Sequence, residues 1–396
     1  MTSTQQPGAP SPDEPGTGAG EGVRPGPTNS LVDVAGLRVG HATRRGEGWL
    51  TGTTVVLAPD QGAVAGVDVR GGGPGTRETD LLDPRNMVER VHAVVLSGGS
   101  AFGLATADGV MERLFDAGIG LPMGQPGEVV PIVPAAVVFD LGRGGDFACR
   151  PDRSVGAEAY DAAVGSTDGV PQGVVGAGTG AKAGGLKGGV GSASAVLADG
   201  TTVAALAVVN ALGSCVDPET GELYSARYAL PGELPQLRRP ATEEVAAHRA
   251  DVEAQIAALG LRPGTATTIG VVATDATLTK AQCAKVAGIA HDGMARGIRP
   301  VHTMFDGDTV FTLATGTRSS PDAFAFHRLL EVAADCFTRA IAHAVLSAET
   351  VETPAGRWRS YRDAFPSAFL PIPPAPPAPP APPAPDMRRA PPSAPI

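Results

Sequence analysis

The sequence is poor in charged and aromatic residues, which make up 18% and 4% of its 396 positions. Its lysines and arginines are fewer than its aspartates and glutamates, and the formal net charge is −10. A nucleic-acid-binding surface requires a basic field, so this balance argues against a nucleic-acid partner. Apolar runs of the roughly 18 residues that a membrane-spanning helix needs are absent as well, and no membrane association is expected.

Cysteine is scarce too. The four cysteines form no CxxC pair and show no zinc-type spacing to histidine: Cys149, Cys215, Cys283 and Cys336. We therefore expect reduced core thiols in a cytoplasmic protein, without disulfides, a metal or a cofactor.

Glycine and proline are abundant, but much of the proline lies at the two ends of the chain. Residues 367–396 repeat a PPA unit, and residues 1–28 are rich in Pro, Gly and Ser. Such compositions cannot build a packed core, so both segments are predicted to be disordered tails. The remaining residues, 29–366, have the size of one large domain.

A nucleotide-binding loop is also lacking. Residues 173–194 are the most glycine-rich part of the putative core, but no Gly-Lys-Ser/Thr follows, and Gly176–Ala181 matches a dinucleotide fingerprint only loosely. Dense glycine around Lys182 and Lys187 instead suggests backbones packed closely about one ammonium group. A desolvated lysine there could orient or activate a nearby hydroxyl.

Strand-like and helix-like patterns alternate along the chain, which predicts an α/β protein. Apolar, β-branched segments read as buried strands at residues 52–59, 92–97, 203–210 and 268–274. Helical spacing of apolar residues occurs at residues 101–117, 242–259, 280–294 (after a Thr279–Gln282 capping box) and 321–345 (after a Ser320-Pro321 cap).

The stretch from Pro263 to Leu278 leads from small residues and threonines directly into one of these strands. If the bond before Thr267 were broken, the α-amine of Thr267 would lie beside its own hydroxyl and could serve as its base. An α-amine has a pKa of about 7.7–8.0, so a fair fraction is unprotonated near neutral pH. Alternatively, Thr267 only begins a strand, as threonine commonly does.

Two strand ends carry polar groups that could join a site. Asn210 ends an apolar strand, where its amide could donate to a substrate or cap a turn. Gly98, Gly99 and Ser100 connect a strand to a helical pattern. Their N–H groups could bind an oxyanion or a carboxylate, or the glycines could only allow a tight turn.

Two charged loops complete the set of candidates. Asp306-Gly307-Asp308 places two carboxylates just before a strand, although Asp-Gly is also an ordinary hairpin signal. Residues 68–80 contain Arg70 and Arg77 among glycines, and they form either a solvated loop or one wall of a site.

The blocks LSGGSAFGL, GAGTGAKAGGLKGG, VVNALG, TTIGVVATDA and HTMFDGD occur in this order and together resemble the self-processing L-aminopeptidase/D-esterase family. The resemblance covers most of residues 29–348. It implies a four-layer αββα sandwich with the chemistry of N-terminal-nucleophile (Ntn) hydrolases but its own connectivity. The threonine and the HTMFDGD block look closest to the branch that includes the nylon-oligomer (6-aminohexanoate) endohydrolase.

This resemblance implies that the chain cuts itself between Ala266 and Thr267 and then uses Thr267 as the nucleophile. The other site residues that it implies are Lys187, Asn210, Asp306 and Asp308. The implied substrates are small amides or short peptides, including D- or β-amino-acid amides and 6-aminohexanoate oligomers. The implied assembly is a homo-oligomer, a tetramer in the family.

One position departs from the pattern. The threonine branch commonly has Asn before Thr-Thr, whereas this chain has Ala266. The similar ornithine acetyltransferases cleave between alanine and threonine, so alanine is compatible with processing. Two alternative functions follow: acyl transfer from an N-acetylated amino acid, or an unprocessed binding protein of the same fold.

Overall fold

The computed structural model describes residues 22–166, 168–259 and 266–369. Most of the two predicted tails, residues 1–21 and 370–396, lies outside the described residues. The N-terminal boundary differs from the prediction, because Arg24 N donates to Val196 O (3.2 Å) and Gly26 N donates to the Ser194 hydroxyl (3.1 Å).

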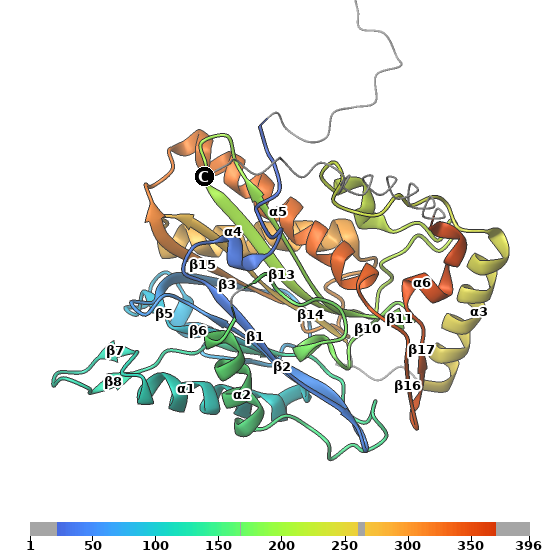
Figure 1. The fold of residues 1–396 in the computed structure, drawn as a ribbon, viewed down its shortest axis with the longest axis horizontal. Helices are drawn as coiled ribbons and strands as arrows, with labels where there is room; N and C mark the ends of the chain where they lie inside the picture. The colour runs from blue at the N-terminus through green and yellow to red at the C-terminus, as the bar shows by residue number, and fades with distance from the viewer. Residues whose placement is uncertain (1–21, 167, 260–265, 370–396) are drawn as a thin grey trace, which may run out of the picture.

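Two mixed sheets are stacked between two layers of helices (Figure 1). The six-stranded sheet has the order β12 (Gly189–Val196), β13 (Thr202–Asn210), β14 (Thr267–Ala276), β15 (Thr309–Arg318), β3 (Ala63–Val69) and β5 (Arg90–Val91). The five-stranded sheet has the order β1 (Arg38–Gly46), β2 (Trp49–Leu57), β6 (Ala93–Ser97), β9 (Ala135–Val137) and β4 (Thr76–Arg77). Three two-stranded sheets join β7 (Leu121–Pro122) to β8 (Val129–Val130), β10 (Lys182–Ala183) to β11 (Leu186–Lys187), and β16 (Val351–Thr353) to β17 (Gly356–Trp358).

Helices cover the outer face of each sheet. On the six-stranded sheet lie α4 (Lys280–Gly297) and α5 (Ala323–Leu346), and on the five-stranded sheet lie α1 (Thr106–Asp116) and α2 (Arg153–Val164). At one side of the sandwich are α3 (Thr242–Leu259) and the short α6 (Tyr361–Ala364), as Figure 1 shows. This arrangement confirms the predicted αββα class.

Buried side chains form three apolar layers, which correspond to the three interfaces of such a sandwich. In β13 and β14, Val208 and Ile269 belong to the layer between the two sheets, whereas Val209 and Val272 face the helices. Because side chains alternate along a strand, Asn210 and Thr267 are on the same faces as Val208 and Ile269. Both side chains therefore point into the space between the sheets.

The predicted helices are found, with two shifted starts. The capping box of Thr279 and Gln282 is present at α4. Helix α5 begins after Asp322, whose carboxylate accepts from Ala325 N (2.8 Å), so the predicted Ser320-Pro321 cap is wrong by two residues. Helix α1 begins only at Thr106, because the chain leaves the left-handed Gly99 through a 3-10 segment.

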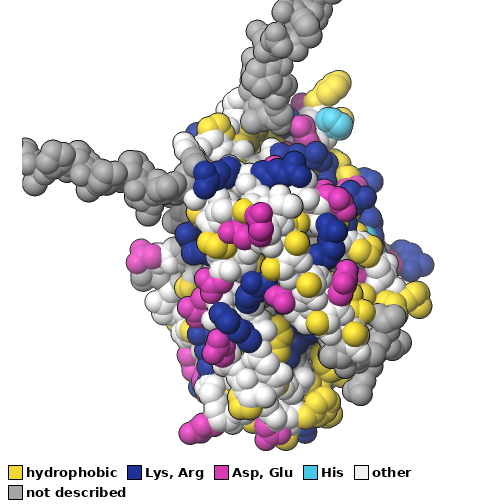
Figure 2. Space-filling view, turned by 90° about the vertical axis from the view of Figure 1, so that its right-hand side faces the viewer, with side chains coloured by type: hydrophobic (Ala, Val, Ile, Leu, Met, Phe, Trp, Pro, Cys, Tyr) yellow, Lys and Arg dark blue, Asp and Glu magenta, His cyan; other side chains and the backbone are white. Residues whose placement is uncertain are grey.

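The surface over α3 and α6 intersperses basic and acidic side chains (Figure 2). Within the described residues, no helix is long and apolar enough to cross a bilayer.

Candidate active site

Thr267 is the first residue of β14 and lies opposite Asn210 of β13 in an antiparallel register. It is almost completely buried, with 4% of its surface exposed. Its hydroxyl donates a hydrogen bond to the carbonyl oxygen of Ala266, the residue before it. The candidate nucleophile therefore lies directly against the carbonyl group of the bond that would have to break.

The carbonyl of Ala266 is held from a second direction. Ala266 pairs with Asp306 in a parallel bridge, and Gly307 N donates to Ala266 O (3.2 Å). A Cβ atom at Gly307 would lie 2.9 Å from the Thr267 hydroxyl and 2.6 Å from Gly73 O. Only glycine fits between the Thr267 hydroxyl and this neighbouring backbone, and its N–H polarises the carbonyl that Thr267 touches.

Asp308 binds the backbone immediately after Thr267. Its Oδ1 accepts from Thr268 N (2.7 Å), and its Oδ2 accepts from His302 N (3.1 Å) and pairs with His302 Nδ1 (2.8 Å). The carboxylate is buried and fully engaged. It fixes the start of β14 relative to the loop that precedes β15.

Asp306 makes a second buried set of bonds. Its carboxylate accepts from Leu212 N (3.3 Å) and from both the backbone N–H (3.2 Å) and the hydroxyl (2.5 Å) of Thr303. Burial raises the pKa of the Asp306 carboxyl, the bonds from Thr303 oppose this rise, and the negative charge of Asp308 adds to it.

The hairpin interpretation of Asp306-Gly307-Asp308 is wrong. The following strand, β15, pairs parallel with β14 and antiparallel with β3, so these residues do not connect two strands of a hairpin. They instead place two carboxylates at the same end of the sheet as Thr267.

The loop of residues 68–80 is a wall of this site. Arg70 N (3.0 Å) and Gly71 N (3.2 Å) donate to Asp308 O, and Gly73 N donates to Asp306 O (2.9 Å). The glycines allow this close approach, because a Cβ at Gly71 would lie 2.2 Å from Asp308 N. Arg77 turns away and pairs with Asp108 (2.5 Å).

Lys187 is buried, and its ammonium group donates to three backbone carbonyls, those of Gly178 (3.1 Å), Ala181 (2.7 Å) and Gly188 (2.9 Å). Burial holds its pKa well below the usual lysine value. This matches the expectation of close backbones around one ammonium, but no hydrogen bond or ion pair joins Lys187 to Thr267 or the aspartates within the described residues.

Lys182 lies opposite Lys187 in the β10–β11 pair and reaches the site through its backbone. Lys182 N donates to Asn210 Oδ1 (3.1 Å). Burial lowers the pKa of its side chain to about 8. The hairpin held by the Lys187 ammonium thus contributes an N–H group to Asn210.

The orientation of the Asn210 side chain is set by an arginine that the sequence did not reveal. Arg143 Nη1 donates to Asn210 Oδ1 (2.5 Å) and to Gly180 O (2.6 Å), while Asn210 Nδ2 donates to Phe139 O (3.2 Å). Burial lowers the pKa of Arg143 to about 10. An arginine has no acceptor, so the amide oxygen must face it and the amide nitrogen must point away.

The Gly98-Gly99-Ser100 junction is connected to this network but offers no free donor. Its three N–H groups donate to Gly52 O (2.9 Å), Asp140 Oδ1 (2.7 Å) and Val138 O (2.9 Å). These amides are therefore not available to an oxyanion or a substrate carboxylate. Asp140 and Arg143 come from a glycine-rich loop without a local motif, which is why only the structure identifies them.

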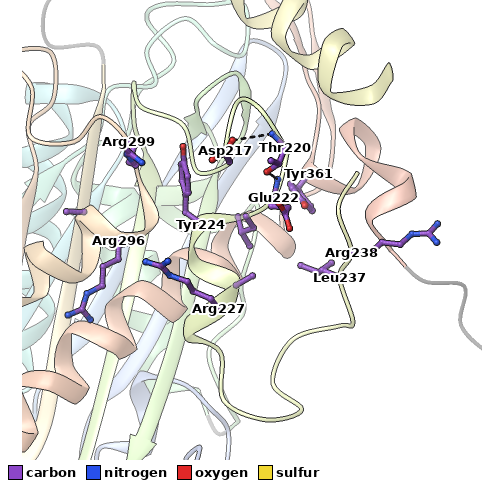
Figure 3. Close-up of a pocket in the computed structure, with 13 residues that line it drawn as sticks. Asp217, Thr220, Glu222, Tyr224, Arg227, Leu237, Arg238, Arg296, Arg299 and Tyr361 are labelled. Atoms are coloured by element: carbon purple, nitrogen blue, oxygen red, sulfur yellow. Dashed lines mark hydrogen bonds between the residues drawn. The ribbon is translucent and has the colours of Figure 1, made fainter. Parts of the chain in front are cut away.

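A large cavity lies on another part of the molecule (Figure 3). It encloses about 750 Å³ between the segment 217–238, the end of α4 and Tyr361. Arg227 and Arg296 both lie at one side of it, whereas Arg238 points away (Figure 3). Because α4 covers the outer face of the six-stranded sheet and Thr267 faces inward, this cavity is not part of the threonine site.

Sequence comparison identifies relatives along nearly the whole described chain. The profile of peptidase family S58 matches residues 29–359. An uncharacterized aminopeptidase of Mycobacterium leprae is 50% identical over 365 residues, covering 87% of this chain and 96% of that protein. The 6-aminohexanoate-oligomer endohydrolase of Paenarthrobacter ureafaciens is 29% identical, covering 75% of this chain and 82% of its own.

Solved structures show the same fold. The β-aminopeptidase of a Burkholderia species superposes with a TM-score of 0.66 at 24% identity, covering 89% of this chain and 97% of its own. The L-aminopeptidase D-Ala-esterase/amidase of Ochrobactrum anthropi, described as a variant of the Ntn-hydrolase fold, gives 0.64 at 21% identity, covering 85% and 92%.

Proposed function

This chain belongs to peptidase family S58 and is a hydrolase of amide bonds, and we propose that it works through an N-terminal threonine that it frees by cutting itself between Ala266 and Thr267. One observation carries the proposal. The Thr267 hydroxyl touches the Ala266 carbonyl oxygen, and Gly307 N donates to the same oxygen (3.2 Å).

Self-cleavage begins when Thr267 Oγ attacks the carbonyl carbon of Ala266. The oxyanion that forms lies where Gly307 N already donates. Collapse breaks the bond to the Thr267 nitrogen, which takes up the hydroxyl proton and leaves as the free α-amine. Water then hydrolyses the ester, releasing a carboxylate on Ala266 and restoring the Thr267 hydroxyl.

Substrate hydrolysis repeats this chemistry with an external amide. The α-amine of Thr267 takes the hydroxyl proton as Oγ attacks, and it returns a proton to the leaving amine. Water releases the acyl group from the resulting ester. Gly307 N is the oxyanion donor that we assign first, since it already contacts a carbonyl in that position.

The remaining residues have distinct roles in this mechanism. Asn210 lies opposite the nucleophile with its amide oriented by Arg143 and is the second candidate to contact the substrate. Asp306 and Asp308 hold the loop and the strand start that carry Gly307 and Thr267. Lys187 supports the hairpin next to Asn210 and acts at a distance from the reacting atoms.

The names of two relatives support a substrate class for this proposal. One is named as an aminopeptidase and another as an endohydrolase of 6-aminohexanoate oligomers. We propose short linear amides, and a panel of α-peptides, β-peptides, D-amino-acid amides and 6-aminohexanoate oligomers would rank them by kcat/KM. The proposal includes a cytoplasmic location, in keeping with four free cysteines, and a homo-oligomeric assembly.

N-terminal sequencing tests the central claim. Purified protein should separate on a denaturing gel into an α-chain ending at Ala266 and a β-chain beginning at Thr267. A single full-length chain with amidase activity would overturn the mechanism. A full-length chain without activity would favour the binding-protein alternative, and acetyl transfer from an N-acetylated amino acid exceeding hydrolysis would favour the acyltransferase alternative that Ala266 allows.

A further inference from the structure

His302 contacts Asp308 twice through different groups. Its backbone N–H (3.1 Å) and its ring Nδ1 (2.8 Å) both reach the same oxygen, Asp308 Oδ2. The residue adopts a left-handed backbone conformation with φ of 58°. This conformation is uncommon for residues other than glycine, and here it brings both donors to one carboxylate oxygen.

The hydrogen bonds also fix the tautomer of the His302 ring. An ionised carboxylate only accepts, so Nδ1 carries the proton and donates to Asp308. The other nitrogen, Nε2, is buried and has no hydrogen-bond partner among the described residues. Among the described residues, no hydrogen bond joins the ring to Thr267, so we assign it no direct role on the reacting hydroxyl.

The His302 ring packs against the ring of His291 in α4. The two rings meet edge to face with centroids 4.7 Å apart. His291 is anchored in turn by its Nε2, which lies 3.0 Å from Asp68 O. His302 is therefore clamped between a carboxylate on its own loop and a ring on a helix.

We propose that His302 is a positioning residue that keeps the N-terminal threonine in place after the chain is cut. Before cleavage, Thr267 is tethered by its bond to Ala266, which pairs with Asp306. Cleavage removes this tether. The start of β14 then depends on its pairing with β13 and β15 and on the bond from Thr268 N to Asp308 Oδ1 (2.7 Å), whose carboxylate His302 orients.

This inference rests on the proposed function, but it makes a different claim about timing. His302 should matter more for hydrolysis than for self-cleavage, because the tether is still present during self-cleavage. A residue needed only for folding would affect both steps in proportion to the loss of stability.

Four variants test it in the full-length protein: His302→Ala, His302→Gly, His302→Asn and His302→Gln. His302→Ala and His302→Gly should still process to completion, with kcat at least about tenfold lower and KM within about twofold. His302→Asn should recover most of the loss, because its amide N–H lies near the position of Nδ1 and asparagine tolerates the left-handed conformation. His302→Gln, whose N–H replaces Nε2, should not.

The exposed His327 provides the control, and His327→Ala should match the parent protein in both rates. The inference is overturned if processed His302→Ala keeps wild-type kcat, or if His302→Asn has a kcat no higher than that of His302→Ala. It is also overturned if His302→Gly, which lacks the ring, has wild-type kcat while His302→Ala does not. Loss of self-cleavage in His302→Ala at an unchanged melting temperature would also overturn it. Failure of the proposed function is distinguishable, since the parent protein itself would then remain uncut.

Discussion

Asn210 and Thr267 oppose each other across the antiparallel strands β13 and β14, and both side chains point between the two sheets. Strand register alone sets this relationship. A shift of one residue would bring Thr268 to this position and turn Thr267 toward the helices. The hydroxyl of Thr268 is buried and has no hydrogen-bond partner among the described residues.

We expect Thr267→Ala to abolish both self-cleavage and hydrolysis, whereas Thr267→Ser should retain both because it keeps a hydroxyl. Thr268→Val is the matched control. Valine has the same shape as threonine, and replacing a hydroxyl without a partner should leave stability and rates nearly unchanged. A denaturing gel, N-terminal sequencing and amidase assays measure the outcome. An unprocessed Thr268→Val protein would show that the nucleophile is Thr268 and not Thr267.

Gly307→Ala should stop self-cleavage, because its Cβ would meet the Thr267 hydroxyl at 2.9 Å and Gly73 O at 2.6 Å. The displaced loop would also remove the N–H donor from the Ala266 carbonyl. Loss of one oxyanion donor typically costs about 10²–10³ in rate. Gly165→Ala is a control with ordinary contacts only, and a Gly307→Ala protein that processes at the parent rate would exclude Gly307 N as the donor.

Asp308→Asn should lower turnover by at least about tenfold, a barrier change of about 1.4 kcal/mol. The carboxylate engages N–H groups with both oxygens, and an amide replaces one acceptor with a donor. The unpaired donors should also cost about 1–3 kcal/mol of unfolding free energy. Asp306→Asn should behave similarly, whereas Asp322→Asn, at the N-cap of α5, should be nearly neutral because asparagine caps as well as aspartate.

The two lysines can be distinguished by replacement with methionine. Lys187→Met should destabilise the protein by several kcal/mol and slow processing, because three buried carbonyls lose their donor. Lys182→Met should have a smaller effect, since Lys182 contributes its backbone N–H to Asn210 and that group is retained. Chemical denaturation and gel-based processing rates would compare the two variants, and equal losses would contradict this assignment.

Acid stability should depend on Glu233. Burial alone would raise its pKa, but bonds from His343 and Arg339 hold it at about 2. A glutamate in the unfolded chain has a pKa of about 4.3. As the pH falls, Glu233 is therefore protonated in the unfolded chain before it is protonated in the folded protein. The ionised Glu233 therefore contributes about 3 kcal/mol to the free energy of unfolding above pH 4.3, and this contribution is lost as the pH falls toward 2.

Glu233→Gln should remove this pH dependence, with little further loss of unfolding free energy between those two pH values. The exposed Glu253→Gln is the control and should keep the acid-induced loss of the parent protein. Equilibrium unfolding at several pH values measures both variants. If Glu233→Gln loses as much unfolding free energy as the parent protein between about pH 4.3 and pH 2, the assignment is refuted.

Much of this fold was readable from local patterns. The strands of β13 and β14 have continuous apolar, β-branched sequences, and the capping box marks the start of α4. Helix α3 occupies the predicted residues, 242–259. These features depend on residues close in sequence, which is why periodicity and capping were sufficient.

The site was only partly predictable, because several of its contacts join distant segments. The predicted Asp306 and Asp308 lie beside Thr267, but Arg143 reaches Asn210 from 67 positions away, in a loop without a motif. The sequence indicated His302 only as part of the HTMFDGD block that resembles the family. Its role depends on a left-handed backbone and on His291, neither of which a sequence pattern indicates.

The pairing of Ala266 with the loop before β15 has a consequence for how activity would appear over time. Gly307 N donates to Ala266 O in the intact chain, so after the proposed cut the new carboxylate of Ala266 would still lie beside this N–H, where the acyl group of an external substrate is proposed to bind. The freshly cut protein would thus begin as a complex with its own first product. Scission and activation become two separate events, and turnover should lag behind the appearance of the two chains by the time that Ala266 needs to leave.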